Sequence, residues 1–343
     1  MSGRSAFCLA YRDDRRANLC IGLCPCQPGH HRADTLSPQQ ILYALPGNDE
    51  LYNAMLSAGG FDGGLLEVSR FPDGESYLRF ETNPEGKHIA LFASLNHPDA
   101  KLISLLLAAR TARDLGAASV GLIAPYMPYF RQDIAFRPGE SVSARHIGAI
   151  LSDNFSWVVT VDPHLHRLTQ MADVFSIPAS VASSTTAMAA WIIKNTECPI
   201  ICGPDSESEQ WVSKIAAACG APYLVFQKTR YDAKSVEVAV APDLDISGYT
   251  PVIIDDIIST GGTVMSLAKE LARLGSRPAI CCVVHALFSS DVEDRILGAR
   301  VDRVITTNSI SHRTNAVDIS EALAESTKAT FSTIANMGTN IAK

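Results

Sequence analysis

Residues 252–263 read VIIDDIISTGGT, and this short stretch decides the fold class. Its three leading apolar residues suit a buried strand, and the turn at 259–263 has the glycine and hydroxyl residues that open a helix. In open α/β sheets, ligands bind outside the carboxyl ends of the strands. A Gly-rich turn at a helix N-terminus directs free N–H groups toward an anion.

The adjacent carboxylates Asp255 and Asp256 narrow the kind of ligand. An Asp N-cap followed by a Gly-rich turn would explain the hydroxyl and glycine residues. It does not explain two carboxylates at the end of a buried strand. Because acidic residues at such strand ends bind ribose hydroxyls, the stretch predicts a site for a phosphorylated ribose.

Strand-like and helix-like segments alternate on both sides of this stretch. Expected strands lie at 41–45, 88–93, 120–124, 157–161, 200–203, 223–226, 236–240, 252–254, 280–285 and 301–306. Expected helices lie at 98–115, 141–151, 185–194, 206–219 and 261–274. Such alternation predicts an α/β fold with mainly parallel sheets flanked by helices.

The alternation forms two series, which predict two similar domains at 41–180 and 181–315. Residues 316–343 suit a strand and a last helix, which could pack back on the first domain. Residues 1–40 differ, with Cys20, Cys24, Cys26 and a His pair but little periodicity. Cys and His are zinc ligands, but this spacing fits no regular knuckle, so we interpret the segment as a disordered extension or the product of an upstream start codon.

Composition excludes several classes of protein. Of 343 residues, 47% are hydrophobic and 19% are charged, and the net charge of −7 argues against a general nucleic-acid binder. The longest apolar run, at 278–288, is far shorter than the roughly 20 residues that span a bilayer. With no signal-peptide pattern and nine cysteines, an odd number, we expect a cytoplasmic protein with reduced thiols and no membrane partner.

Four further segments, together with the stretch at 252–263, match the sequence pattern of one protein family. They read RFPDGE at 70–75, PYMPYFRQD at 125–133 (continuing as FRPGE at 136–140), VDPH at 161–164 and KTR at 228–230. In this order they resemble the ribose-phosphate diphosphokinases, which have the type I phosphoribosyltransferase fold. The resemblance covers about residues 41–320. It implies an enzyme that transfers the diphosphoryl group of ATP to C1 of ribose 5-phosphate and releases AMP.

The resemblance also implies roles for individual residues. Lys228 and Arg230 would be catalytic, and Arg230 would also hold ribose 5-phosphate together with Asp255, Asp256, Ser259, Thr260, Gly261, Gly262 and Thr263. ATP would contact Phe71, Asp73, Gly74, Glu75, Arg131, Gln132, Asp133, Arg137 and His164. Mg²⁺ would lie near Asp162, His164 and Asp205. Since the turn at 73–75 reads the adenine of a neighbouring subunit in this family, we expect a homo-oligomer, dimeric or larger.

Two alternatives to this function are a non-catalytic regulatory homologue and a phosphoribosyltransferase. After Gly203-Pro204-Asp205 the sequence reads SESE at 206–209, where small residues and glycine are usual in the family. Extra acids there would repel a diphosphate, which is the one feature that favours a non-catalytic regulatory homologue. A phosphoribosyltransferase would use the same sugar loop, but it would not need the segments at 131–133 and 228–230.

Overall fold

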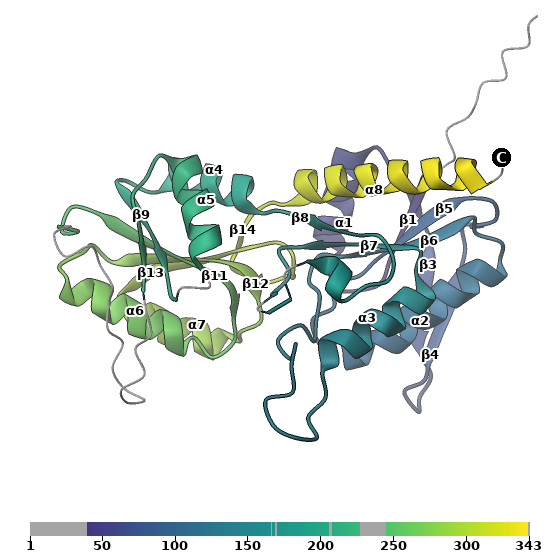
Figure 1. Cartoon of the computed structure of the whole chain (residues 1–343), viewed down its shortest axis with the longest axis horizontal. Helices are drawn as coiled ribbons and strands as arrows, with labels where there is room; N and C mark the ends of the chain where they lie inside the picture. Colours follow the sequence, from purple (N-terminus) through teal and green to yellow (C-terminus); the bar gives the residue numbers. More distant parts are fainter. Residues whose placement is uncertain (1–39, 166, 169, 206–207, 227–244, 342–343) are drawn as a thin grey trace, which may run out of the picture. The chain divides into compact units, whose positions relative to one another are not determined.

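The computed structural model describes residues 40–341 apart from 166, 169, 206–207 and 227–244 (Figure 1). The expected strand at 236–240 and the N-terminal cysteine segment lie outside these residues. The described chain contains two six-stranded sheets and one hairpin. Each sheet is entirely parallel, which confirms the predicted fold class.

The first sheet has the strand order β2-β1-β5-β6-β7-β8. Its strands are β1 (Gln40–Ala44), β2 (Asp62–Gly64), β5 (His88–Phe92), β6 (Ser119–Ala124), β7 (Trp157–Val161) and β8 (Ala179–Ala182). All five residues of β7 are buried, as expected for a strand covered on both faces. Strand β8 extends two residues past position 180, so the domain boundary given above cuts through a strand of the first sheet.

The second sheet has the order β10-β9-β11-β12-β13-β14. Its strands are β9 (Pro199–Gly203), β10 (Tyr223–Val225), β11 (Thr250–Ile258), β12 (Ala279–Ala286), β13 (Val301–Thr307) and β14 (Asn315–Val317). If the strands are numbered by their sequence order within each sheet, both sheets read 2-1-3-4-5-6. The two halves of the chain therefore share one topology.

Helices cover both faces of each sheet (Figure 1). They are α1 (Asp49–Gly59), α2 (Asp99–Asp114), α3 (Ser143–Asn154), α4 (Thr185–Asn195), α5 (Glu209–Cys219), α6 (Gly262–Arg273), α7 (Ser290–Leu297) and α8 (Ser320–Ile341), with a short 3₁₀ turn at Met171–Asp173. On the second sheet, α4 and α5 lie on one face and α6 and α7 on the other. None of the described helices is both long and apolar enough to cross a bilayer.

Helix α8 leaves the second half of the chain and packs on the first sheet, against α1, β7 and β8. The ring of Phe331 lies edge-on to Trp157, with ring centroids 4.7 Å apart. The Thr330 hydroxyl donates a hydrogen bond to Ser180, at 2.9 Å. One hydrophobic cluster contains Phe331 together with core residues of both sheets, so the last helix contributes to the core of the first half.

A hairpin that the periodicity did not predict projects from the first half. It consists of β3 (Leu66–Arg70) and β4 (Ser76–Phe80), which pair antiparallel. The Phe71 N–H donates to the Glu75 carbonyl at 2.8 Å, and the Gly74 N–H donates to the Phe71 carbonyl at 2.9 Å. Gly74 has φ of 94°, which glycine adopts without steric cost. The segment RFPDGE is thus a hairpin turn.

Candidate active site

Strand ends from both sheets meet around one cavity of about 560 Å³. Its walls include residues after β7, after β9 and within β11. The lining consists of His164, Leu165, Asp205, Ser208, Glu209, Gln210, Trp211, Ser213, Tyr223, Asp255 and Asp256. Four of the residues proposed from the sequence, His164, Asp205, Asp255 and Asp256, therefore face the same space.

Strand β11 carries the acidic pair because it is longer than the sequence suggests. It pairs in register with β12 as far as Ile258 and Ala286, so Asp255 and Asp256 lie within the ladder and not in a loop. The backbone N–H of Asp256 also donates to the Asp255 carboxylate, at 3.0 Å. Paired backbone on a sheet holds both carboxylates in fixed positions.

The pKa values of the two carboxyls in this pair are shifted in opposite directions. Burial, and next the charge of Asp256, raise the pKa of Asp255 well above its ordinary value. Burial is the largest single influence on the pKa of Asp256 and acts to raise it, but the hydrogen bond and charge of His164, the charge of His285 and the hydrogen bond with Asp255 together lower it. Negative charge therefore concentrates on Asp256, which binds Nδ1 of His164. This contact joins the first sheet to the second.

The turn that carries His164 is held by Asp162. Asp162 is buried and has φ of 30°, a left-handed conformation that is strained for a residue other than glycine. One oxygen of its carboxylate accepts hydrogen bonds from the Ser184 N–H at 2.7 Å and the Ser184 hydroxyl at 2.6 Å. Burial raises the pKa of Asp162 despite these bonds.

A buried histidine and a tyrosine lie behind the acidic pair. His285 on β12 is 1% exposed, and the Tyr126 ring packs edge-on against it with centroids 5.0 Å apart. Burial lowers the pKa of His285 to about 4, so the ring is neutral near pH 7. Burial raises the pKa of Tyr126, which also feels the charges of Arg131 and Asp256.

The Gly-rich turn leads from β11 into α6, as predicted. Gly261 has φ of 73°, and a Cβ there would come within 2.9 Å of the Ile296 side chain on α7. Glycine is required here both by the backbone conformation and by the contact with α7. Ser259 and Thr260 are exposed, and α6 begins at Gly262, so the N–H groups of its first turn are available to an anion.

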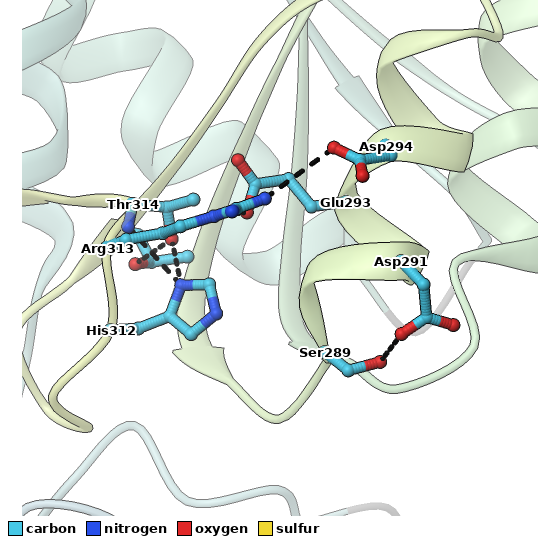
Figure 2. A network of polar contacts seen from close by, with 8 residues as sticks. Ser289, Asp291, Glu293, Asp294, His312, Arg313 and Thr314 are labelled. Atoms are coloured by element: carbon cyan, nitrogen blue, oxygen red, sulfur yellow. Dashed lines mark hydrogen bonds and ion pairs between the residues drawn. The ribbon is translucent and has the colours of Figure 1, made fainter.

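Helix α7, which supports this turn, is tied to the segment before β14. Figure 2 shows the Arg313 guanidinium between two acids of α7. Its nitrogens lie 2.8 Å from Glu293 and 3.6 Å from Asp294. His312 stacks edge-on with Phe288 at 4.8 Å between ring centroids, and it also bonds the Thr314 hydroxyl at 2.7 Å.

Apart from His164, which lines the cavity, the residues expected to contact ATP fall in two other places. Asp133 is buried and accepts hydrogen bonds from the Arg167 N–H at 2.9 Å and the Arg167 guanidinium at 3.2 Å. Burial is the largest single influence on the Asp133 pKa and acts to raise it, but these bonds, the charge of Arg167 and a backbone hydrogen bond of Asp133 itself together lower it. Arg131 and Arg137 are exposed, and Gln132 is partly exposed. Phe71, Asp73, Gly74 and Glu75 are exposed on the hairpin turn and do not line the cavity.

The remaining predicted residues lie partly outside the described chain. Lys228 and Arg230 are in the segment 227–244, and Ser206 and Glu207 are also outside the described residues. Ser208 is buried, and its N–H donates to the Asp205 carboxylate at 3.1 Å. The second half of the acidic segment therefore begins α5 next to the cavity, with Glu209 in its wall.

The donor set suits a hard divalent cation. Carboxylates of Asp205, Asp255 and Asp256 line one cavity, and Mg²⁺ prefers oxygen ligands while keeping several waters. Nδ1 of His164 is engaged with Asp256, so carboxylates are the better donors. In the described part of the chain, no group of three or more His, Cys, Asp or Glu side chains is arranged so that it could hold a metal ion. Mg²⁺ commonly takes only one or two ligands from the protein, and substrate phosphates and waters supply the others.

Sequence reasoning missed several residues of this region. Tyr126 lies inside a recognised segment but received no role, and Trp211 and Tyr223 in the cavity wall were not singled out. His285 interrupts the otherwise apolar strand AICCVVHA. A histidine at the carboxyl end of a buried strand was the signal that could have identified it.

The two parallel sheets share one topology, and strand β11 of the second sheet carries an acidic pair followed by a Gly-rich helix start. These features define a protein of the phosphoribosyltransferase fold. Residues 40–154 match the N-terminal domain of ribose phosphate pyrophosphokinase, and residues 173–319 match the phosphoribosyl transferase domain. The chain belongs to the ribose-phosphate pyrophosphokinase family.

Similar proteins include two curated relatives and one solved structure. The ribose-phosphate pyrophosphokinase of Saccharolobus solfataricus is 34% identical over 82% of this chain and 97% of its own length. That of Methanopyrus kandleri is 30% identical over 76% of this chain and 89% of its own length. The crystal structure of phosphoribosylpyrophosphate synthetase from Mycobacterium smegmatis has a TM-score of 0.76 and 24% identity, and covers 86% of this chain and 99% of that one. The last comparison shows a shared fold.

Proposed function

We propose that this protein is a ribose-phosphate diphosphokinase that makes 5-phosphoribosyl 1-diphosphate and AMP from ATP and ribose 5-phosphate. The observation that carries the proposal is the contact of His164 with Asp256 in a cavity that both sheets build. It joins two separate segments of the family pattern, VDPH and VIIDDIISTGGT, in one site. A phosphorylated sugar and a nucleotide can meet there.

The sugar-binding part consists of the β11 end and the turn at 259–263. Asp255 and Asp256 would accept hydrogen bonds from the ribose hydroxyls, and the start of α6 would bind the 5-phosphate. The C1 hydroxyl of the sugar attacks the β-phosphorus of ATP, the bond from that phosphorus to the α-phosphate oxygen breaks, and AMP leaves. Such transfers depend mainly on positioning and charge stabilisation.

The nucleotide part would use Arg131, Gln132, Arg137 and His164. Asp133 has a supporting place in this scheme, because its carboxylate binds Arg167 and fixes the segment that follows His164. Lys228 would stabilise the charge that develops on the transferring group, and Arg230 would help hold ribose 5-phosphate. These two assignments rest on the family pattern.

Magnesium would be held at Asp205, Asp255 and Asp256 and neutralises polyphosphate charge when bound. The Asp162 carboxylate, also proposed from the sequence, binds Ser184 and the Asp256 carboxylate binds His164, so Mg²⁺ would share either group with its present partner. The carboxylates, by themselves, would repel a polyphosphate. We therefore expect activity to vanish in excess chelator and to return with Mg²⁺.

The hairpin turn favours an oligomer. Phe71, Asp73, Gly74 and Glu75 are exposed and absent from the cavity wall of their own chain. A contact with nucleotide would then be made in the site of a neighbouring subunit. Mixing Asp73→Ala with Lys228→Ala subunits under exchanging conditions should restore activity, and proven exchange without recovery would contradict this arrangement.

The decisive experiment measures AMP release by wild type and Lys228→Ala. A point charge that acts mainly in the transition state raises kcat, and removing such a donor costs about 10²–10³ in rate. We expect kcat to fall by that factor while both substrates still bind, and Lys228→Arg to recover little. Lys194→Ala, at the exposed end of α4, is the matched control. A wild type that binds nucleotide without turnover would favour a regulatory homologue.

A further inference from the structure

His285 lies at the point where the two sheets exchange hydrogen bonds, although it does not line the cavity. On β12 it is the register partner of Ile257, the residue after Asp256. Its Nε2 lies 3.3 Å from the backbone carbonyl of Asp162, and its Nδ1 lies 2.9 Å from the Ser309 hydroxyl. The imidazole thus bridges the ends of β7 and β13.

The partners of the ring define its tautomer. A backbone carbonyl can only accept, so Nε2 carries the proton and donates it to Asp162. In the neutral ring Nδ1 is then an acceptor, and its neighbour is the Ser309 hydroxyl at 2.9 Å. That hydroxyl has one proton, which it can direct to Nδ1 or to the Val284 carbonyl 3.0 Å away.

The bonded carbonyl belongs to the strained residue at the start of the site turn. The Asp162 carboxylate is fixed by Ser184, and its carbonyl is fixed by His285. With both ends held, the left-handed backbone at Asp162 is maintained, and the chain turns to bring His164 to Asp256. Without the bond at the carbonyl, the strained peptide could relax and move His164.

We propose that His285 is a positioning residue, whose Nε2–H holds the Asp162 carbonyl and thereby places His164 against Asp256. This inference rests on the proposed function for its catalytic consequence. If His285 acted only by packing, an apolar side chain of equal size would serve as well at this position. The hydrogen bond requires a donor at the distance of Nε2.

Glutamine and methionine make a matched pair of replacements. Both are unbranched and of similar length, and both lose the ring and its contact with Tyr126. Only glutamine carries an N–H near the position of Nε2. We expect His285→Met to lower kcat for AMP release about 10- to 100-fold more than His285→Gln, as supporting residues around an active site typically do. KM for both substrates should stay similar in the two variants, since the loss concerns the arrangement of the reacting groups.

Stability separates this role from packing. Urea unfolding of both variants gives the cost of losing the ring, and a kcat difference without a matching stability difference supports positioning. Equal kcat values for the glutamine and methionine variants would overturn the proposal. So would a loss confined to KM.

A second measurement needs no turnover. Long-range ¹H–¹⁵N spectra of the wild type report the tautomer of each histidine, and the His285→Gln variant identifies the signals of His285. We expect a neutral ring with its proton on Nε2, and a proton on Nδ1 would overturn the proposal. A wild type that shows no turnover would contradict the proposed function, whereas the tautomer would still decide whether His285 donates to Asp162.

Discussion

The strand ends of the two sheets form two clusters that correspond position by position. The acidic cluster, His164, Asp205, Asp255 and Asp256, comes from the fifth strand of the first sheet and the first and third strands of the second. The amide cluster, Asn48, Ser94, Asn308 and Ser309, comes from the first and third strands of the first sheet and the fifth strand of the second. The same topology has therefore produced two junctions with the roles of the sheets exchanged.

The side chains of the amide cluster are neutral and bond one another and nearby carbonyls, and the Lys101 ammonium donates to the Ser94 carbonyl at 2.6 Å. The Asn48 amide nitrogen lies 2.9 Å from the Ser94 hydroxyl, 2.9 Å from the Asn308 carbonyl and 3.2 Å from the Ser309 carbonyl. The Ser94 hydroxyl donates to the Ser309 carbonyl at 2.7 Å. Buried polar groups that are fully bonded add specificity without a demand for a ligand.

The acidic cluster instead concentrates carboxylates around an open cavity. Burial and the charge of Asp256 raise the pKa of Asp255. A bound cation and donor hydroxyls would therefore stabilise the charged carboxylates of the cluster. The comparison teaches that equivalent positions serve stability where their polar groups satisfy one another. They serve binding where charge is left for a ligand to neutralise.

The largest effect that would test this contrast is expected at Asp256. Asp256→Asn removes the charge that binds His164 and should lower kcat about 100- to 1000-fold. The free energy of unfolding should fall modestly, because the lowered pKa of Asp256 means that the folded state favours its charged form, which asparagine lacks. AMP release and urea unfolding measure the two effects. Asp302→Asn on the exposed part of β13 is the control and should keep the wild-type kcat. A wild-type kcat in Asp256→Asn would break the contrast.

An intermediate effect of the opposite kind is expected at Asn48. Asn48→Ala removes the Asn48 donor from the partly buried Asn308 carbonyl and one of two donors from the Ser309 carbonyl. Losing the partner of a buried polar group typically costs about 1–3 kcal/mol of unfolding free energy. The kcat should fall much less than in Asp256→Asn, because Asn48 does not line the cavity. Asn53→Ala, exposed on α1, is the control. A large kcat loss at unchanged stability would show that the amide cluster also belongs to the active site.

The smallest effect is expected at Arg313, in the ion pairs of Figure 2. The guanidinium is about half exposed, and exposed ion pairs contribute about 0–1 kcal/mol. Arg313→Ala should therefore cost less than Asn48→Ala, and its effect should shrink in high salt. Because α7 packs on Gly261, any kinetic effect should be a modest rise of KM for ribose 5-phosphate. Arg273→Ala, which loses a pair within α6, is the comparison, and an effect equal to that of Asn48→Ala would show that the exposed pair is energetically important.

The sequence predicted the alternating α/β fold and the two series because buried parallel strands are short apolar runs between helices. It placed the strand before the acidic pair at 252–254, whereas β11 extends over Thr250–Ile258. The extension depends on pairing with β12, and carboxylates in a strand have no local signature. The hairpin was missed because its two strands have mixed polarity and are partly exposed, so they lack the apolar run by which the buried strands were recognised.

The acidic pair was proposed because it ends an apolar strand before a Gly-rich turn, whereas Asp205 and His164 were assigned from the resemblance to the family. The roles of Asp133 and Asp162 could not be read in this way, since their partners Arg167 and Ser184 are set by tertiary structure. His285 contacts Asp162 from 123 positions away. Local periodicity carries no information on such a pairing.

The return of α8 to the first sheet affects how the chain can fold during synthesis. Trp157 and Phe61 contact Phe331, which the ribosome adds only after all strands of the second sheet. Until then part of the apolar surface of the first half remains uncovered, although its six strands are complete. The second half is in effect an insertion between β8 and α8, and the first half cannot reach its final core as a nascent domain. Truncation near the C-terminus is thus expected to damage the earliest part of the fold.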